Sequence, residues 1–372
     1  MATIIIPTPL RKFTNQQSRV QINGTTIQSV IDDLVLNFPD LKKNLIDESG
    51  KIRSYVNIFL EDDDIRDLQQ EATPVNPNAT ISIIPAIAGG SGWEDITFSK
   101  QELARYNRHI IIPEFGLEAQ QKLKAARVLV IGSGGLGSPL LLYLAAAGVG
   151  NIGIVDLDIV DDSNLQRQVL FDIKDLAKPK VDAAKERLER LNPHINIKTY
   201  NTQLTADNAL SIFKDYDVVA DGTDNFPTRY LVNDASVLSG IPNVYASIFQ
   251  FEGQVSVFNY KDENGQLGPN YRDLYPTPPA PGLVPNCAEG GVLGVLPGII
   301  GSLQANEVIK VITGVGTPLS GRFFVFDALT FETRTLKISK QASSPKIEKL
   351  IDYEQFCGVK AIEKPIKEIT VS

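Results

Sequence analysis

Up to Gly90, the chain alternates short apolar runs with polar turns. Four runs have the length and the β-branched content of β-strands, and they cover residues 3–6, 19–22, 55–60 and 80–84. Between the second and third runs, apolar side chains recur at helical spacing, and Thr25 or Thr26 can cap the helix that this spacing predicts. These side chains are Ile27, Val30, Ile31, Leu34 and Val35. The order of the elements predicts a small α+β domain over residues 1–90.

A different pattern begins after a polar connector over residues 91–101. Residues 128–131 form a continuous apolar run, which is typical of a strand that is buried on both faces of a parallel sheet. A glycine-rich turn follows, then an apolar helix that has Pro139 in its first turn, and then a second strand over residues 152–155. This unit predicts a Rossmann-like α/β domain over residues 102–340, with a tail over residues 341–372.

Composition and charge narrow the class of protein. The chain has 372 residues, of which 43% are hydrophobic and 22% charged, so it can form more than one folded core and is not disordered as a whole. Its formal net charge of -8 argues against binding to nucleic acid or to an anionic membrane surface. We expect a cytoplasmic protein, because there is no apolar run of about 18 residues and the first residues do not form a secretory signal.

The glycine-rich turn is the first candidate site. Gly132, Gly134 and Gly137 have the G-x-G-x-x-G spacing between a predicted strand and a predicted helix. Such a turn leaves backbone N–H groups open to phosphate oxygens at the positive end of the helix. Asp156 ends the second strand and can accept hydrogen bonds from ribose hydroxyl groups. These residues fit NAD as well as ATP, so a nicotinamide-dependent oxidoreductase is one candidate.

Three later segments, residues 163–168, 178–180 and 221–225, favour ATP. Arg167 and Lys180 can stabilise the negative charge that develops on a triphosphate during nucleotidyl transfer. Asp224 follows a predicted strand, and a single carboxylate together with phosphate oxygens is a suitable ligand set for Mg²⁺. A dehydrogenase needs neither feature. A noncatalytic ubiquitin-like scaffold, which would not bind ATP, is the remaining alternative.

These segments, together with residues 105–109 and 285–291, resemble the ThiF/MoeB family of adenylyltransferases, which are relatives of the ubiquitin-activating enzymes, over residues 103–337. The resemblance implies that ATP and Mg²⁺ are used to adenylylate the C-terminal glycine of a ubiquitin-like sulfur-carrier protein. It also implies a homodimer in which Arg108 reaches the ATP of the neighbouring subunit. The residues that would line the ATP site are Gly135, Asp156, Ser163, Asn164, Leu165, Gln166, Arg167, Lys180, Asp224 and Asn225.

The first domain resembles the β-grasp sulfur carriers of the MoaD/ThiS/CysO type. It ends in Gly89-Gly90, and glycines have no side chain that could block entry into a narrow active site. The same dipeptide, followed by Ser91, also fits a flexible linker. Because Gly90 is followed by Ser91, its carboxyl group is an amide that cannot be adenylylated. Either a JAMM-type metalloprotease cleaves after Gly90, or the domain is a docking module for free carriers.

The two cysteines, Cys287 and Cys357, are too few for a disulfide scaffold or a four-cysteine zinc site. The family resemblance implies that Cys287, which follows a proline-rich stretch, takes part in acyl or persulfide transfer, whereas Cys357 matches no catalytic motif. Many family members bind a structural zinc ion with two C-x-x-C pairs. At the corresponding places, residues 270–273 and 342–346, this chain has no cysteine, so we expect no zinc.

The C-terminal tail resembles the connector that leads to a rhodanese domain in longer relatives. We therefore expect that a separate sulfurtransferase, either a rhodanese or a cysteine desulfurase, delivers the sulfur, or that the chain is a truncated form. Molybdopterin, thiamine and cysteine biosynthesis and tRNA thiolation all use this chemistry, and the sequence does not choose among them.

Overall fold

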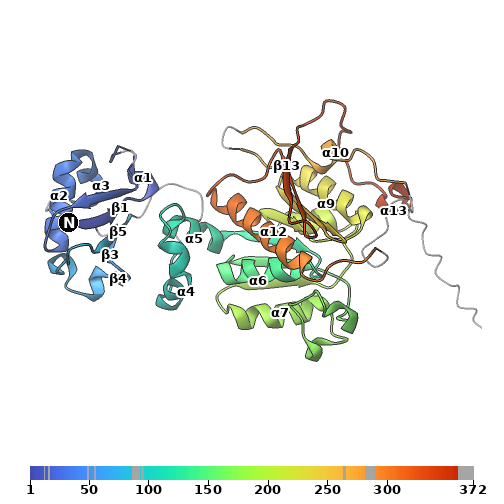
Figure 1. The fold of residues 1–372 in the computed structure, drawn as a ribbon, viewed down its shortest axis with the longest axis horizontal. Helices are drawn as coiled ribbons and strands as arrows, with labels where there is room; N and C mark the ends of the chain where they lie inside the picture. The colour runs from blue at the N-terminus through green and yellow to red at the C-terminus, as the bar shows by residue number, and fades with distance from the viewer. Residues whose placement is uncertain are drawn as a thin grey trace, which may run out of the picture. The chain divides into compact units, whose positions relative to one another are not determined.

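The computed structural model describes the chain except for residues 12, 16, 48–49, 54–55, 86–92, 94–95, 263–264, 281–289 and 359–372. The expectations for Gly89, Gly90, Cys287 and the end of the tail therefore lie outside the described residues. The chain forms two compact units, Met1–Lys122 and Leu123–Ser372 (Figure 1).

The first unit contains a five-stranded sheet in the order β2-β1-β5-β3-β4. β1 (Ala2–Ile5) pairs antiparallel with β2 (Arg19–Ile22) and parallel with β5 (Thr80–Pro85). β3 (Val56–Leu60) pairs antiparallel with β5 and with β4 (Asp63–Asp64). The first and last strands lie parallel in the centre of the sheet, and this topology confirms the predicted β-grasp fold.

The helix α2 (Ile27–Asn37) begins after Thr26, whose side chain accepts a hydrogen bond from the backbone N–H of Ser29. Thr26, and not Thr25, is therefore the cap. The predicted apolar face of α2 is buried, and it belongs to a hydrophobic core whose buried members all lie between Ala2 and Ile83. Because this core is closed within residues 1–90, we expect that segment to fold without the rest of the chain.

Several short elements of the first unit were not predicted, because they are too short to show a periodic pattern. They are α1 (Thr8–Arg11), η1 (Pro39–Leu41), α3 (Lys42–Leu45), η2 (Ile65–Asp67) and η3 (Gln70–Ala72). Two longer helices, α4 (Lys100–Ile110) and α5 (Gly116–Ala125), follow the connector, and Ser99 caps α4 in a capping box with Glu102. The boundary between the compact units falls within α5. The division of the chain at residues 91–101 stays a prediction.

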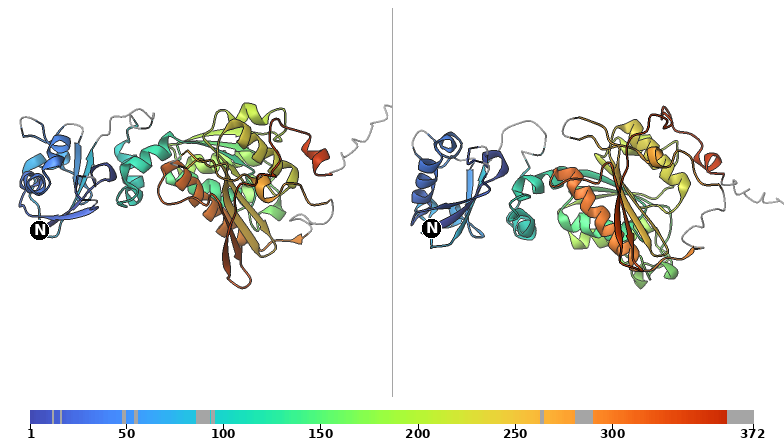
Figure 2. Two further views of the ribbon diagram at one scale, coloured as in Figure 1. Left: turned by 90° about the horizontal axis from the view of Figure 1, so that it is seen from above. Right: turned by 45° about the horizontal axis from the view of Figure 1, so that its top comes forward.

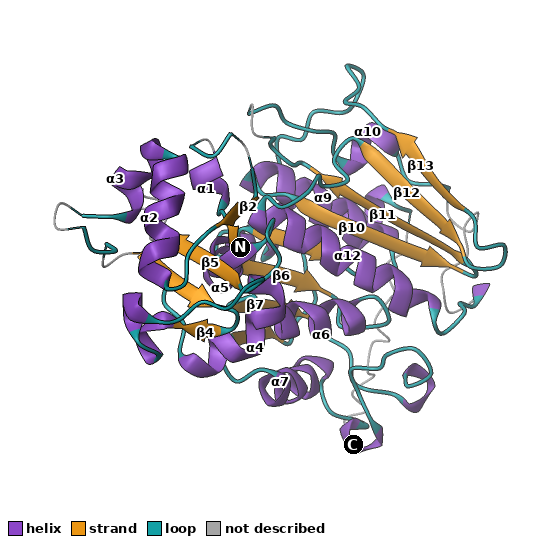
Figure 3. Cartoon of the chain, turned by 60° about the vertical axis from the view of Figure 1, so that its left-hand side comes forward, coloured by secondary structure: helices purple, strands orange, loops and turns teal. Residues whose placement is uncertain are grey.

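The second unit contains an eight-stranded sheet in the order β13-β12-β11-β10-β9-β6-β7-β8. The five strands from β10 to β8 run parallel, and β11, β12 and β13 extend one edge as antiparallel strands (Figure 3). The strands are β6 (Arg127–Ile131), β7 (Asn151–Val155), β8 (Asn196–Tyr200), β9 (Val218–Asp221), β10 (Asn243–Phe249), β11 (Glu252–Phe258), β12 (Arg322–Asp327) and β13 (Thr333–Lys337). This sheet confirms the predicted Rossmann-like fold.

Helices cover both faces of this sheet. Crossover connections between parallel strands are right-handed, so connections that run toward opposite edges of the sheet place their helices on opposite faces. α6, α7 and α12 lie side by side on one face (Figure 1), and α8 packs against α9. α12, orange in Figure 2, contacts β9, β10 and β11. The helical elements are η4 (Asp162–Asn164), η5 (Ile173–Asp175), α6 (Gly137–Ala147), α7 (Lys180–Leu191), α8 (Ala209–Phe213), α9 (Phe226–Ser239), α10 (Tyr271–Leu274), α12 (Leu296–Thr313) and α13 (Tyr353–Phe356).

Within the part of the chain that the structure describes, no helix combines the length and the apolar character needed to cross a membrane.

Candidate functional site

A cavity of about 230 Å³ opens at the carboxyl ends of β6 and β9 in the second unit. The chain leaves β6 toward β7 on one side of the sheet and leaves β9 toward β10 on the other side. In open α/β sheets this reversal of strand order creates a crevice that binds ligands. The sheet topology therefore places the cavity where a nucleotide is expected.

The glycine turn forms the floor of the cavity. Glycine is required at positions 132 and 137 for two different geometric reasons. Gly132 has a φ of 86°, a conformation that side chains rarely adopt. A Cβ atom on Gly137 would lie 2.1 Å from the carbonyl oxygen of Gly132, so only glycine allows the helix to start this close to the turn. Gly134 and Gly135 line the cavity itself. The turn is therefore shaped for close approach of a ligand to the backbone.

Asp156 connects the glycine turn to the end of β7. Its Oδ2 accepts hydrogen bonds of 2.8 Å from both the backbone N–H and the hydroxyl group of Ser133, and its Oδ1 accepts one of 2.9 Å from the N–H of Asp158. A carboxylate offers about four acceptor positions. Asp156 thus holds the turn in place, and its carboxylate has one acceptor position beyond these three bonds for a ribose hydroxyl group.

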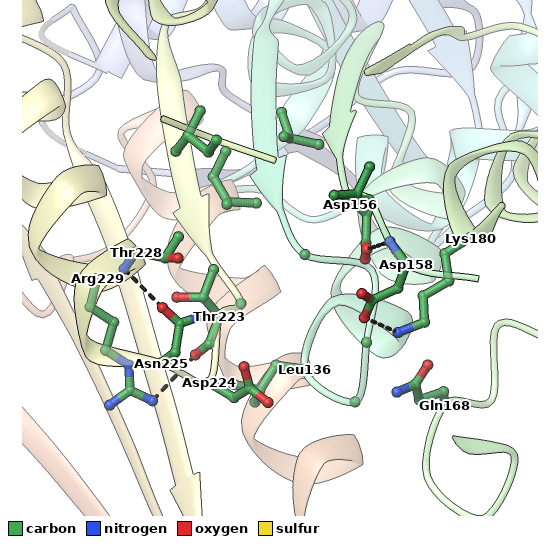
Figure 4. A pocket seen from close by; sticks show the side chains of 18 of the residues that line it. Leu136, Asp156, Asp158, Gln168, Lys180, Thr223, Asp224, Asn225, Thr228 and Arg229 are labelled. Carbon is green, nitrogen blue, oxygen red and sulfur yellow. Dashed lines mark hydrogen bonds and ion pairs between the residues drawn. The ribbon is translucent and has the colours of Figure 1, made fainter. Parts of the chain in front are cut away.

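Two cations line the cavity, and one of them, Lys180, lies on the same wall as Asp156 (Figure 4). Lys180, the first residue of α7, is buried, and its Nζ lies 2.8 Å from Oδ2 of Asp158. The side chain of Asp158 is 71% exposed, so this pair lies at the cavity surface and not in the core. Arg167 also lines the cavity, and its Nη1 donates to the carbonyl oxygen of Ser163 over 3.2 Å.

The opposite wall is formed by the turn after β9 and the first turn of α9 (Figure 4). Asp224 is exposed and lines the cavity. Asn225 caps α9, because its Oδ1 accepts a hydrogen bond of 2.9 Å from the N–H of Thr228. Arg229 donates from Nη2 to the carbonyl oxygen of Thr223 over 3.2 Å. This wall combines one carboxylate with one guanidinium group.

The structure brings most of the predicted site residues together. Those that line the cavity are Gly132, Gly134, Gly135, Asp156, Arg167, Lys180, Asp224 and Asn225. Gly137 lies behind the turn, and Ser163, Asn164, Leu165 and Gln166 form the neighbouring loop without lining the cavity. Arg108 lies exposed in the last turn of α4, in the other compact unit.

The cavity also contains residues that were not selected from the sequence, among them Gln168, Thr223 and Arg229. Gln168 is 4% exposed, and its Oε1 has no hydrogen-bond partner in the part of the chain that the structure describes. A buried amide oxygen without a partner at a cavity wall is a group that a ligand can satisfy. Gln168 directly follows Arg167, and Arg229 lies one helical turn after Asn225, so spacing from the motif residues was the available signal.

Asp221, the last residue of β9, is buried behind the cavity and does not line it. Burial raises the pKa of Asp221, while the positive charge of Arg229 acts in the opposite direction. Oδ1 of Asp221 accepts hydrogen bonds from the N–H and the hydroxyl group of Thr223, at 2.9 and 2.6 Å. Asp221 therefore shapes the turn that presents Asp224, and it does not itself face the ligand.

Residues 270–273, where the family resemblance places one zinc-binding pair, are joined by hydrogen bonds to the segment where it places the other. Oδ1 of Asp273 accepts from the hydroxyl group of Ser344 at 2.6 Å and from the N–H of Gln341 at 2.9 Å. No cluster of three or more His, Cys, Asp or Glu side chains that could hold a metal occurs among the described residues. Polar contacts connect the two segments in this chain.

Cys357 is buried in the core of the second unit. Burial raises the pKa of its thiol to about 11, and the nearby charge of Arg272 only partly opposes this. A thiol with this pKa stays protonated at neutral pH and is a poor nucleophile. The structure therefore gives Cys357 a packing role.

The reversed strand order, the glycine turn and the polar cavity define a nucleotide-binding α/β protein. Comparison with known proteins identifies the family: residues 106–347 match the model of the ThiF family, and the chain belongs to that family. Residues 4–90 match the model of the ThiS family.

The curated relatives of this chain are named as adenylyltransferases. The chain is 57% identical over 263 residues, 71% of its length and 67% of the relative, to the probable adenylyltransferase/sulfurtransferase MoeZ of Mycobacterium tuberculosis. It is 49% identical over 269 residues, 71% of its length and 99% of the relative, to the sulfur carrier protein adenylyltransferase of Thermus thermophilus. It is 46% identical to the adenylyltransferase and sulfurtransferase MOCS3 of Mus musculus, over 72% of this chain and 58% of the relative.

Solved structures agree on the fold. PaaA is similar with a TM-score of 0.55 and 23% identity, over 68% of this chain and 79% of that one. Escherichia coli MccB, solved with ATP, is similar with a TM-score of 0.53 and 20% identity, over 74% of this chain and 77% of that one. At these identities the likeness supports the fold alone.

Proposed function

We propose that this chain is an adenylyltransferase that uses ATP to activate the C-terminal glycine of a ubiquitin-like sulfur-carrier protein for thiocarboxylation. The observation that carries the proposal is the glycine-lined cavity at the switch point of the sheet, which is also lined by Arg167, Lys180 and Asp224. A ThiS-family region precedes this ThiF-family region in the same chain, and the carrier class follows from that combination.

In the proposed reaction, a carboxylate oxygen of the carrier's last glycine attacks the α-phosphorus of ATP. The bond between the α-phosphorus and the bridging oxygen breaks, and pyrophosphate leaves with the electron pair, so an acyl-adenylate remains. No proton is transferred, because a terminal carboxyl group with a pKa of about 3.5 is already ionised at neutral pH. The enzyme therefore needs to position the two anions and to neutralise charge, which Arg167 and Lys180 are placed to do.

Asp224 is the residue that would hold Mg²⁺, since it is an exposed carboxylate on the cavity wall and Mg²⁺ usually takes one or two carboxylates with phosphate oxygens and water. Bound Mg²⁺ would neutralise charge on the phosphate groups. The orphaned amide oxygen of Gln168 and the glycine turn fit the rest of a nucleotide. Asp156 would bind the ribose, and Asn225 would hold the first turn of α9 beside the ligand. Ser163, Asn164, Leu165 and Gln166 would shape the loop next to Arg167, whose Nη1 donates to the carbonyl oxygen of Ser163.

We further propose a homodimer with shared sites, in which Arg108 acts on the ATP of the partner subunit. Apolar side chains that are more than half exposed gather in the loops next to the cavity, and a second copy would cover them. These side chains are Leu157, Ile159, Val169 and Ile173. Co-expression of Arg108→Ala and Asp224→Ala chains tests the sharing: mixed dimers regain about a quarter of wild-type activity if sites are shared, and none if each site is contained in one subunit.

For the sulfur step, we propose that Cys287 accepts or relays sulfur and that a separate sulfurtransferase, a rhodanese or a cysteine desulfurase, supplies it. Cys357 is excluded from this role by its burial and its raised pKa. Thiocarboxylate formation assayed with and without an added sulfurtransferase tests this: full turnover by the chain alone would contradict a separate donor. The pathway served, molybdopterin, thiamine, cysteine or tRNA thiolation, depends on which carrier is used, and ATP use is consistent with the cytoplasm.

The peptide bond between Gly90 and Ser91 must be reconciled with this chemistry. We propose cleavage after Gly90, for which a JAMM-type metalloprotease is a suitable partner. The intact masses of the protein from its native cell test the cleavage. A fragment that ends at Gly90 supports it, and full-length chain alone points instead to a docking module for free carriers.

The central test is ATP–pyrophosphate exchange. The full-length chain is incubated with ATP, Mg²⁺ and residues 1–90 as a free carrier that ends at Gly90. Exchange that requires the carrier supports the proposal. Exchange without the carrier, or none with any Gly-Gly carrier, contradicts it.

A further inference from the structure

The cavity has two walls of different chemistry. Figure 4 shows Asp156, Asp158 and Lys180 on one wall, and Thr223 and Arg229 on the facing one. On the first wall each anion or cation has a bonded polar neighbour: Ser133 donates to Asp156, and Lys180 donates to Asp158. This wall suits the hydroxyl and phosphate groups of a nucleotide. On the facing wall, Asp224 is the proposed Mg²⁺ ligand, and Arg229 is the cation that a second, anionic ligand would meet.

Arg229 is held in one place on the facing wall. Its Nη2 donates to the carbonyl oxygen of Thr223 at 3.2 Å, and its guanidinium carbon lies 5.8 Å from the ring centre of Phe226 and 5.7 Å from that of Tyr245. This hydrogen bond and the aromatic neighbours restrict the rotamers of the side chain, and contacts with aromatic rings are favourable for a cation. The positive charge is therefore positioned before any ligand arrives.

Apolar side chains continue the cavity beyond Arg229. Ile248, near the end of β10, and Val292 both line it. Val292 forms a bridge with Gln250, and the N–H of Leu293 donates to the carbonyl oxygen of Gln250 at 3.0 Å, so backbone hydrogen bonding holds the apolar Val292 next to the end of β10. An extended, uncharged peptide that ends in a carboxylate is complementary to such a surface. The sequence Ala86-Ile87-Ala88-Gly89-Gly90 of this chain has that chemistry once Gly90 is terminal.

We propose that Arg229 binds the C-terminal carboxylate of the carrier and so places it against the α-phosphate. This inference rests on the proposed function, and it names the residue that recognises the second substrate. The triphosphate carries about four negative charges, so it repels a carboxylate that approaches it. A cation that does not bind the phosphates is needed to offset the charge of the carboxylate. Arg229 supplies that charge from the wall opposite Lys180 (Figure 4).

A purely structural role for Arg229 makes a different prediction. Its charge acts on the buried Asp221 and on Tyr245, so Arg229 could serve only to stabilise the interior. In that case its loss would weaken folding and both substrates together. A carboxylate-binding role would affect the carrier and spare ATP.

The experiment measures ATP–pyrophosphate exchange by full-length Arg229→Gln and Arg229→Lys, with residues 1–90 as free carrier. For Arg229→Gln we expect the KM for the carrier to rise about 10- to 100-fold, because a charge-assisted hydrogen bond is lost, while the KM for ATP changes less than about twofold. Arg229→Lys retains the charge without the planar fork and should give an intermediate KM for the carrier. Lys180→Gln is the matched comparison, with the larger effect on ATP.

A second measurement needs no variant enzyme. Wild-type protein is titrated with two carriers, one that ends in the Gly90 carboxylate and one that ends in the carboxamide, in the presence of a non-hydrolysable ATP analogue. The proposal requires the acid to bind at least about tenfold more tightly than the amide. Equal binding of acid and amide overturns it, and so does an Arg229→Gln enzyme whose two KM values rise together or do not change. If wild-type enzyme shows no carrier-dependent exchange, the proposed function itself fails, whatever the variants do.

Discussion

Two clusters of charged side chains in the second unit show how differently one protein uses ionic groups. In the cavity, Lys180 is bonded to Asp158, whose side chain is 71% exposed, and Asp224 faces solvent. In the interior, the side chains of Arg272 and Asp234 are only 6% and 2% exposed and form two parallel hydrogen bonds of 2.8 and 2.7 Å. The first cluster can exchange a partner for a substrate, whereas the second cannot.

In the interior cluster, the Asp234 carboxylate accepts hydrogen bonds from further side chains besides Arg272, so we call this cluster closed. Tyr353 donates from its hydroxyl group to Oδ2 of Asp234 at 2.8 Å, and Asn233 donates to Oδ1 at 3.0 Å. The guanidinium group of Arg272 lies 5.1 Å from the ring centre of Tyr230 and 4.7 Å from that of Phe356. The cluster joins α9, α10 and α13, and α10 immediately precedes the proline-rich stretch that leads to Cys287. A satisfied buried network fixes the backbone around it, while the open cluster supplies chemistry.

The largest effect is expected from breaking the closed cluster. Asp234→Ala leaves the Arg272 guanidinium group buried without its carboxylate partner and should lower the free energy of unfolding by about 3–5 kcal/mol. Denaturant unfolding of the second unit measures this. Asp158→Ala is the comparison: it removes an exposed carboxylate but leaves the Lys180 side chain, which is 6% exposed, without that partner, so it should cost less than Asp234→Ala, about 1–2 kcal/mol. Similar losses in the two variants would remove the distinction between the clusters.

For activity, we expect a change in the cavity cluster to have the larger effect. Lys180→Gln should lower kcat/KM for ATP–pyrophosphate exchange about 100- to 1000-fold, because a cation that stabilises transition-state charge is lost. Its free energy of unfolding should change by less than about 1 kcal/mol. A Lys180→Gln protein that keeps full activity, or that loses as much stability as Asp234→Ala, would place Lys180 in the structural cluster instead.

Cysteine chemistry gives a third comparison. Burial raises the pKa of Cys357 from 9.0 to about 11, so its thiolate fraction at pH 8 falls from about 10% to about 0.1%. In a Cys287→Ser protein, where Cys357 is the remaining cysteine, we therefore expect alkylation to be about 100-fold slower in the folded state than after unfolding in denaturant. The thiol is protonated in both the folded and the unfolded state below about pH 9. Stability is therefore unaffected there and is lost as the pH rises from 9 toward 11. Equal alkylation rates with and without denaturant would show that Cys357 is accessible.

A smaller effect is expected from Tyr353→Phe. This change removes one hydrogen bond to the buried Asp234 carboxylate and should lower the free energy of unfolding by about 2 kcal/mol. Tyr216→Phe is the control, because the Tyr216 hydroxyl group bonds to another hydroxyl group, that of Tyr200, at 3.1 Å, and its loss should cost about 1 kcal/mol. The difference between the two variants, measured by thermal unfolding, isolates the contribution of the buried charge.

Much of the cavity follows from local sequence. The apolar strand, the glycine turn and Asp156 lie within one strand–helix–strand unit, so their spacing alone predicts where they meet. Arg167, Lys180 and Asp224 lie in the three segments over residues 163–168, 178–180 and 221–225 that favoured ATP. The structure brings all three residues to one cavity. Gln168 and Arg229 were not selected, although each lies within four positions of a motif residue, because the sequence does not show which of the residues near a motif line the cavity.

The sequence by itself determined the two fold classes, the glycine turn and the polar residues that accompany it, because these depend on periodicity and on spacings of a few residues. Only the tertiary structure decided which charges are closed and which are open. Arg272 and Tyr353 lie 38 and 119 positions from Asp234 along the chain, so no local pattern predicts that they meet. The exposure of the acidic partner then separates the roles: the Asp234 carboxylate is buried together with Arg272, whereas the Asp158 carboxylate that pairs with Lys180 is exposed and can be replaced by a substrate.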